Sequence, residues 1–339
     1  QSWIAAGWAR SVEPLRPDWW RVHSIGDTEV REDPAAKAAR IPTFAWKTAK
    51  QALLDGPVLF HVMRRGYIPA LVCQECRDSA LCPVKNCLGI LRVLSGHSGP
   101  TCARCGALAG SWSCPNCHGN RLRALTPGAE RTAEELGRAF PGVPVVWSQA
   151  EHRIEEIQPE PAVVVATPGA EPHVREGYPA VVLLDSRVMQ PSLAGGEDQV
   201  RRWFAACALV KRGGAICLVG DPALAEAQAV IRWDSRWYAS RVLQERKVAG
   251  LPPAVRVAEL TGPEDGLNEI VSRLTVPHRI LGPVSVTESG GGERARNFVL
   301  VRRSDGRQLT GDLDAAQRWA SAESGPGRQV RVRMDPRDM

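Results

Sequence analysis

The feature that most constrains this 339-residue chain is a group of eight cysteines arranged as four close pairs. A spacer of two residues lets both thiolates of a pair reach one tetrahedral zinc ion at about 2.3 Å, and three of the four pairs have that spacer. The cysteines are Cys73, Cys76, Cys82, Cys87, Cys102, Cys105, Cys114 and Cys117. They predict two Zn²⁺ sites with four thiolates each. Because four protein ligands leave no position for a reactive water, both sites are expected to be structural.

The sequence leaves three groupings of these pairs open: sequential, nested and crossed. We favour the nested grouping, because an insertion must leave and re-enter its parent sheet at nearby points. One site would then contain Cys73, Cys76, Cys114 and Cys117, and the other Cys82, Cys87, Cys102 and Cys105. The longer spacer between Cys82 and Cys87 loosens that pair, so the second site is expected to lose its metal first. The alternatives are substitution of a ligand by His97 or His118, and a cluster of reduced thiols without metal.

Outside the pairs, Cys207 and Cys217 fall in apolar segments and are expected to lie in the core. The chain has no run of about 18 apolar residues and no signal-peptide pattern, which favours an intracellular protein with reduced thiols and no membrane partner. It begins without Met and within helical sequence, so we expect that an amino-terminal portion has been removed. The formal net charge of +6 permits nucleic-acid binding without requiring it.

Apolar runs alternate with helix-length amphipathic segments along most of the chain, which predicts an α/β fold. Helices are expected at residues 43–54, 130–140, 196–210, 222–231 and 233–250, and strands at 58–63, 121–125, 143–147, 162–166, 181–184 and 215–219. Continuous apolar runs such as Ala162–Ala166 are typical of central parallel strands. The natural packing is a doubly wound sheet with helices on both faces, and the cysteine region is an insertion between elements of that sheet.

A second composition change, at Pro252-Pro253, ends the long helix and opens another domain. Beyond it, strands are expected at residues 255–260, 280–287, 297–302 and 329–334, and helices at 264–274 and 313–322. This βαββαβ order predicts a small ferredoxin-like sandwich.

Five short motifs around these segments resemble the PriA family of primosomal replication-restart helicases, in matching order and spacing from about residue 40 onward. They are Arg64–Leu71, Pro127–Glu130, Leu251–Pro253, Leu281–Val284 and Met334–Pro336. The resemblance implies a second RecA-like helicase lobe with a two-zinc insertion, followed by a carboxy-terminal domain like a small ribosomal protein. It also supports the nested zinc grouping.

The resemblance divides the chain into four parts. They are the end of a first RecA-like lobe with a linker (1–42), the second RecA-like lobe (43–71 and 119–249), the zinc-binding insertion (72–118) and the carboxy-terminal βαββαβ domain (250–339). The family's Walker A loop would lie upstream of Gln1, so an ATP site would belong to the full-length protein.

The chain departs from the active helicases of this family at two motifs. Where they carry a loop with Thr-Gln and Lys-Gly, the segment Thr167–Pro172 keeps only the Thr. Where they carry a Gln-x-x-Gly-Arg-x-Gly-Arg element, whose arginines stabilise charge on the transferred phosphoryl group, Trp203–Val210 contains no arginine. Lys211 and Arg212 follow as the nearest cations. The pattern resembles the actinobacterial branch, whose helicase motifs are degenerate, so we assign no catalytic residue.

Four arginines are the candidate DNA contacts: Arg64, Arg65, Arg302 and Arg303. The first two follow a strand beside the insertion, and the other two belong to the carboxy-terminal domain. Arg331 and Arg333, with Arg328 before them, would share one face of the last strand, because positions two apart point the same way. The alternative for all of them is ordinary solvated charge.

These observations favour a replication-restart protein without helicase activity, which recognises stalled or abandoned forks and assists primosome assembly and reloading of the replicative helicase. One alternative is an active ATP-dependent 3′–5′ DNA helicase of superfamily 2, and a weaker one is a zinc-ribbon protein of transcription or RNA metabolism. The expected partners are forked DNA, single-stranded DNA-binding protein and the replicative helicase or its loader. We expect a monomer located in the cytoplasm, at the nucleoid.

Overall fold

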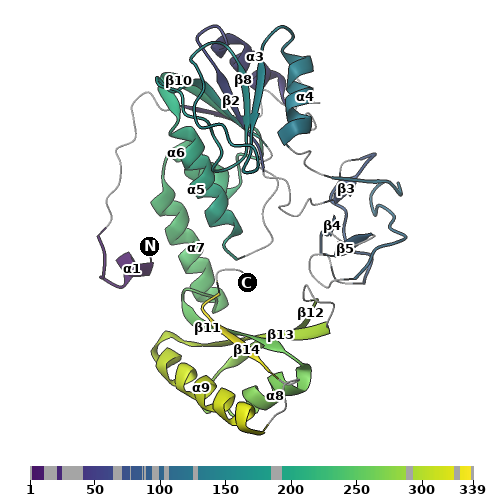
Figure 1. Cartoon of the computed structure of the whole chain (residues 1–339), viewed down its shortest axis with the longest axis vertical. Coiled ribbons are helices and arrows are strands. Elements are labelled where there is room, and N and C mark those ends of the chain that lie inside the picture. Colours follow the sequence, from purple (N-terminus) through teal and green to yellow (C-terminus); the bar gives the residue numbers. More distant parts are fainter. Residues whose placement is uncertain are drawn as a thin grey trace. The chain divides into compact units, whose positions relative to one another are not determined.

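The computed structural model in Figure 1 describes most of the chain and divides it into two compact units. The residues it describes are 2–10, 21–24, 41–63, 71–76, 78–85, 87, 89–93, 99–102, 107–124, 129–184, 193–287, 293–323 and 329–336. One unit is Pro14–Ser235, and the other comprises Gln1–Glu13 and Arg236–Met339. The domain boundaries predicted from the sequence stay predictions. Within the described residues, no helix is both long enough and apolar enough to cross a membrane.

A six-stranded sheet, in which every neighbouring pair is parallel, forms the centre of the first unit. Its strands are β1 (Val22–Ser24), β2 (Val58–His61), β7 (Val145–Ser148), β8 (Val163–Ala166), β9 (Tyr178–Leu183) and β10 (Val210–Leu218), in the order β1-β10-β9-β2-β8-β7. Every residue of β2, β8 and β9 is buried, as expected for central strands covered on both faces.

Helices cover both faces of this sheet, which confirms the predicted α/β packing. On one face, α3 (Thr43–Ala52) and α4 (Ala129–Ala139) pack against alternate residues of the strands. On the other, α5 (Gly195–Cys207) and α6 (Ala225–Arg232) cover the remaining residues. Cys217 and Cys207 lie in these two cores, as the sequence predicted.

The cysteine region enters this fold between β2 and α4 and has two small antiparallel sheets of its own. One pairs β3 (Leu71–Cys73) with β6 (Leu122–Ala124), and the other pairs β4 (Leu91–Val93) with β5 (Pro100–Cys102). The apolar core between them is small, and its largest member, Trp112, donates its indole N–H to the Leu81 carbonyl at 2.9 Å.

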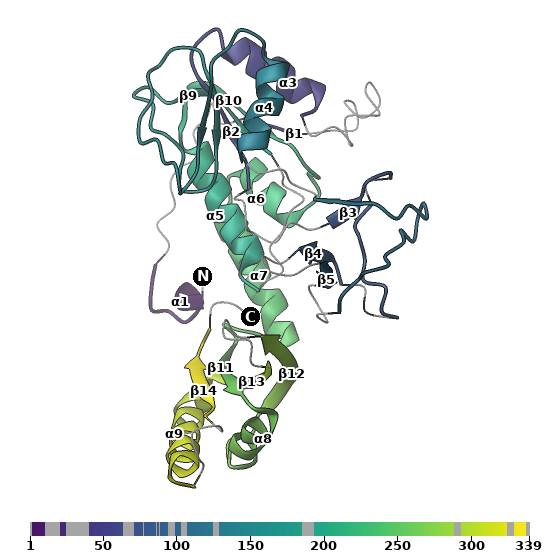
Figure 2. The same cartoon turned by 45° about the vertical axis from the view of Figure 1, so that its right-hand side comes forward.

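The second unit contains the predicted βαββαβ domain. After α1 (Ser2–Ala5) and the long helix α7 (Ser235–Ala249), its elements are β11 (Val255–Gly262), α8 (Glu264–Ser272), β12 (Arg279–Thr287), β13 (Glu293–Arg302), the short 3₁₀ helix η2 (Arg303–Asp305), α9 (Gly306–Glu323) and β14 (Arg331–Met334). The strands form an antiparallel sheet in the order β12-β13-β11-β14. Both α8 and α9 cover the same face of it (Figure 2).

Several elements are longer than the sequence predicted, and β10 and α9 show why. Strand β10 begins at Val210, five residues before the apolar run at Ala215, and its pairing with β9 is irregular between them, where Gly213 has φ 78°. Helix α9 begins at Gly306 instead of Leu313, because Leu309 is buried together with Leu313. In both cases tertiary packing extends an element into sequence that is polar or rich in glycine.

The loop that follows α8 is held by one carboxylate of α9. The side chain of Asp312 accepts hydrogen bonds from the backbone N–H of Thr275 at 2.7 Å, from the Thr275 hydroxyl at 2.9 Å and from the backbone N–H of Val276 at 3.0 Å. Burial raises the pKa of the Asp312 carboxyl, but the bonds from Val276 and Thr275 outweigh it and hold the pKa below its ordinary value.

We predict that Asp312→Ala lowers the free energy of unfolding by about 1–2 kcal/mol, because three donors lose their acceptor. Since the folded-state pKa is lowered, this contribution is fully present above the ordinary aspartate pKa and is lost as the pH falls through the folded-state value. Chemical denaturation at several pH values measures both effects. The matched control is Asp314→Ala on the same helix, where an exposed pair with Arg318 is worth about 0–1 kcal/mol.

Candidate metal centre

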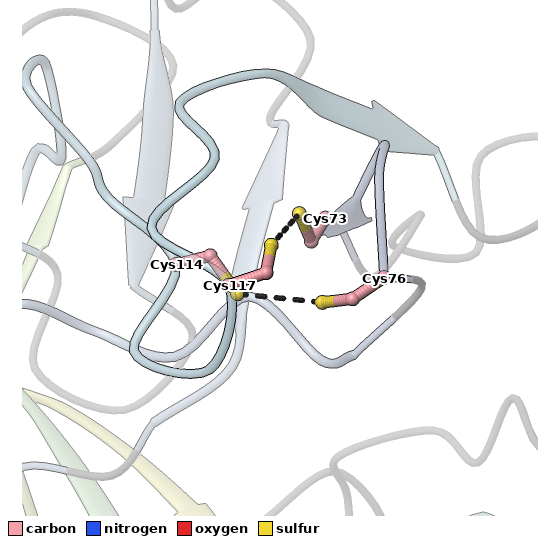
Figure 3. Close-up of side chains that lie close together, drawn as sticks. All are labelled: Cys73, Cys76, Cys114 and Cys117. Carbon is pink, nitrogen blue, oxygen red and sulfur yellow. Dashed lines mark hydrogen bonds between the residues drawn. The ribbon is translucent and has the colours of Figure 1, made fainter.

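Four thiols converge at the base of the insertion (Figure 3). Cys73 ends strand β3 and Cys76 lies in the turn after it, while Cys114 and Cys117 lie in the turn that precedes β6. The Sγ atoms of Cys73 and Cys117 are 3.4 Å apart, those of Cys76 and Cys114 are 3.5 Å apart, and all four lie within 4.8 Å of one another. Zinc–sulfur bonds of about 2.3 Å place tetrahedral ligands about 3.8 Å apart, whereas a disulfide needs about 2.05 Å. The spacing therefore fits a metal site.

Backbone hydrogen bonds position both halves of this four-thiol site. The N–H of Cys73 donates to the Asp78 carbonyl and the N–H of Cys114 to the Gly119 carbonyl, each at 2.8 Å. Gly119 has a steric role as well, because a Cβ there would lie 2.6 Å from a carboxylate oxygen of Glu75. The turn thus brings Glu75 within 4.0 Å of the Cys117 sulfur.

The thiols of this site differ in how readily they lose their protons. Hydrogen bonds from the backbone N–H groups of Cys117 and Asn116 lower the pKa of the Cys114 thiol to about 7. A hydrogen bond from the Gly119 N–H lowers the pKa of the Cys117 thiol. The adjacent Cys76 and Cys73 thiols act in the opposite direction and outweigh it, so the pKa is raised to about 12. Four crowded sulfurs cannot all be thiolates without a cation between them, and a divalent metal supplies that charge.

A second group of thiols comprises Cys82, Cys87 and Cys102, whose Sγ atoms also lie within 4.8 Å of one another. The Cys87 and Cys102 sulfurs are 3.7 Å apart. Cys105, the predicted fourth member, lies outside the described residues, as does His97. The seven described thiols of the four cysteine pairs thus fall into the nested grouping. Two soft thiolate clusters are compatible with zinc, and the metal and its ligands stay predictions.

A buried polar pair, which sequence reasoning missed, lies where β2 and β8 end. His61, the last residue of β2, places its Nε2 atom 3.2 Å from Glu171 Oε1, although the two are not aligned as a hydrogen bond. The other carboxylate oxygen of Glu171 accepts the N–H of Gly169 at 2.8 Å, so this pair ties down the loop that departs from the helicase motif. Burial raises the pKa of Glu171, but the adjacent His61 holds it below its ordinary value.

The second departing motif is part of the hydrophobic core. Trp203, Ala206 and Cys207 have no exposed surface. They pack against β9 and β10 on one face of the sheet. Of the two cations that follow, Lys211 donates to the carbonyl of Asp55 at 3.4 Å and Arg212 is exposed.

The described residues include two of the four candidate DNA contacts. Arg64 and Arg65 lie outside the described residues. Arg302 is exposed at the end of β13, while Arg303 donates to the carbonyl of Pro253 at 2.7 Å. Arg331 and Arg333 are both exposed and do share one face of β14, as their spacing predicted. Their role in DNA binding stays a prediction.

Comparison with known proteins gives consistent relatives. Residues 247–337 match the family described as the Primosomal protein N C-terminal domain. "Probable replication restart protein PriA" of Mycobacterium bovis is 40% identical over 98% of this chain and 55% of its own length, and that of Mycobacterium leprae is 36% identical over 98% and 54%. "Replication restart protein PriA" of Thermotoga maritima is 26% identical over 88% and 43%. The chain therefore spans about half the length of these relatives.

We predict that Cys76→Ser releases one of two metal ions per chain and destabilises the insertion, while the six-stranded sheet stays folded. Elemental analysis of the purified protein, with circular dichroism on the same sample, measures both. The control is Cys207→Ala, which removes a thiol from the sheet's core and should leave the metal content unchanged. Retention of two zinc ions by the Cys76 variant would show that the ligand assignment is wrong.

We predict that Glu171→Ala lowers the free energy of unfolding by about 1–3 kcal/mol, because it leaves the buried His61 and the Gly169 N–H without their partner. Because the folded-state pKa of Glu171 is lowered, its contribution is present above the ordinary glutamate pKa and fades as the pH falls through the folded-state value. Denaturation curves at pH 7 and at acid pH, with the exposed Glu176→Ala as control, check the size and the direction.

Proposed function

This chain is a homologue of replication restart protein PriA along 98% of its length, and from that relationship we propose that it recognises abandoned replication forks. In this role it assists primosome assembly and the reloading of the replicative helicase, probing forks by shape and phosphate contacts. The observation that carries the proposal is the homology itself, which extends across the sheet, the cysteine insertion and the matched carboxy-terminal domain.

The same proposal includes the absence of helicase activity. In an active motor, positioned arginines stabilise the charge that develops on the transferred phosphoryl group, and one such arginine contributes about 10³ to 10⁵ in rate. Where the family carries them, this chain has Trp203, Ala206 and Cys207 buried in the core of the sheet. The loop that would couple ATP to DNA is held by Glu171, which accepts the Gly169 N–H and lies beside the buried His61.

The cysteine insertion serves this function as a rigid platform. Its apolar core is too small to fix several turns by burial alone, so two Zn²⁺ ions held by the eight paired cysteines would supply the missing stability. Closed four-thiolate sites add no reactivity. We propose that both metals are structural, and that the exposed surface of the insertion is available for contacts with other proteins of the primosome.

The partners follow from the same role. They are forked DNA, single-stranded DNA-binding protein, and the replicative helicase or its loader, contacted by a monomer at the nucleoid in the cytoplasm. Arg64, Arg65, Arg302 and Arg303 remain candidate DNA contacts, and ATP remains a candidate ligand of the full-length protein.

We predict that the full-length protein binds forked DNA but shows no DNA-dependent ATP hydrolysis, because the residues that stabilise the transition state are absent. Steady-state phosphate release with forked and single-stranded DNA tests this, with zinc content measured on the same sample so that misfolding cannot mimic inactivity. Absence of turnover with two bound zinc ions supports a recognition protein without a motor. Clear DNA-stimulated turnover would contradict the proposal and favour the active helicase.

A further inference from the structure

One buried carboxylate joins three neighbouring strands of the carboxy-terminal sheet. Glu259 lies on the central strand β11 and is only 6% exposed. Its Oε1 atom is 3.0 Å from the Nε of Arg296 on β13, and its Oε2 atom is 2.9 Å from a terminal nitrogen of Arg333 on β14. The carboxylate thus links the two strands that flank β11 through their arginines.

The pairing register places this group on the face of the sheet opposite to the one that α8 and α9 cover. Glu259 is directly opposite Arg333, and Thr261 is directly opposite both Arg296 and Arg331. Residues that pair across antiparallel strands share a face, and so do residues two apart along a strand. The intervening residue Leu260 packs instead into the core beneath α8 and α9.

The group carries an excess of positive charge that reaches solvent. Two guanidinium groups share one carboxylate, which leaves a net charge of +1, and the exposed Arg331 lies beside them on the same face. The side chains of Arg296 and Arg333 remain 37% and 45% exposed while the carboxylate is covered. The two contacts are ion pairs and not aligned hydrogen bonds, because Glu259 Oε2 and Arg296 Nε lack a hydrogen-bond partner among the described residues. Each guanidinium has five N–H donors, so donors remain for a ligand.

Stability alone gives little reason for such an arrangement. A buried carboxylate is costly to desolvate, and replacing buried Arg–Glu–Arg groups by apolar residues is often neutral or stabilising. What the carboxylate does provide is fixed orientation. An arginine held by an acidic partner loses its rotamer freedom before a ligand arrives, so less conformational entropy is lost when the ligand binds.

We propose that Glu259 is a positioning residue that holds Arg296 and Arg333 as a fixed pair of phosphate-binding forks, and that their ligand is the backbone of DNA. Planar guanidinium groups match the oxygen geometry of a phosphate, and the net positive charge of the group attracts the polyanion. The inference rests on the proposed fork recognition and assigns part of it to this face of the carboxy-terminal sheet.

Substitution of Glu259 by Gln distinguishes a role in positioning the two arginines from a role in neutralising surface charge. If Glu259 only neutralised the surface, its loss would add one positive charge and tighten DNA binding. If it positions the arginines, the same substitution weakens DNA binding by about tenfold, because two long side chains must then lose their rotamer freedom when the DNA binds. Asp314→Asn is the matched control, because it adds the same charge on α9, at an exposed pair with Arg318.

The experiment is equilibrium binding of a fluorescent forked oligonucleotide to the full-length protein, followed by anisotropy at several salt concentrations. We expect Glu259→Gln to bind more weakly than both the wild type and Asp314→Asn. Arg333→Gln should weaken binding and reduce the slope of log affinity against log salt by about 1. In an Arg296→Gln, Arg333→Gln background, Glu259→Gln should no longer weaken binding, because the side chains it positions are gone and only its effect on net charge remains.

Three results would overturn the inference: binding by Glu259→Gln as tight as or tighter than that of Asp314→Asn, an unchanged affinity in Arg333→Gln, or an undiminished effect of Glu259→Gln without the arginines. If Glu259→Gln does not fold, the deciding variant is Arg333→Lys, which keeps the positive charge but removes the planar guanidinium. Wild-type affinity in that variant would reject the proposal. Absence of fork binding by the wild type would instead reject the proposed function, and this inference with it.

Discussion

The close approach of four cysteine sulfurs at the base of the insertion is the constraint on which the first unit depends. The chain leaves the sheet after β2 and must return to it at α4, and the pairing of β3 with β6 beside Cys73 brings the two crossings together. The core of the insertion is too small to close a loop of this length by apolar burial. A metal held by Cys73, Cys76, Cys114 and Cys117 would close it and let the six-stranded sheet form as if uninterrupted.

Much of the fold could be predicted because its signals are local. The apolar run Val163–Ala166 became an interior strand of the sheet. The paired spacing of the cysteines predicted thiol clusters, and the argument that an insertion leaves and re-enters its sheet at nearby points favoured the nested grouping that the described thiols adopt. The pair of His61 and Glu171 could not be predicted, because it depends on which strands are neighbours in the sheet. Glu259 offered one signal, an acidic residue between the apolar residues Ala258 and Leu260, but its partners Arg296 and Arg333 follow only from the strand register.

The two units use charge in different ways. In the first, Glu171 lies beside the buried His61 and accepts the Gly169 N–H, and the stretch around Trp203 is apolar. In the second, the arginines of β13 and β14 are held by a carboxylate yet remain exposed. Of these groups, the arginines of the second unit are the ones that present positive charge to solvent.

The antiparallel order of the carboxy-terminal sheet also has a consequence for biosynthesis. Strand β14 pairs with β11, the first strand of the domain, so Met334 lies opposite Ala258, and Arg256 pairs with Asp335. A ribosome delivers β11, α8, β12, β13 and α9 before the strand that completes their sheet. Until Arg333 emerges, Glu259 lacks one of its two partners and one side of β11 stays open. The nascent domain therefore exposes one unpaired edge of its central strand until β14 is made, and such edges are prone to aggregation.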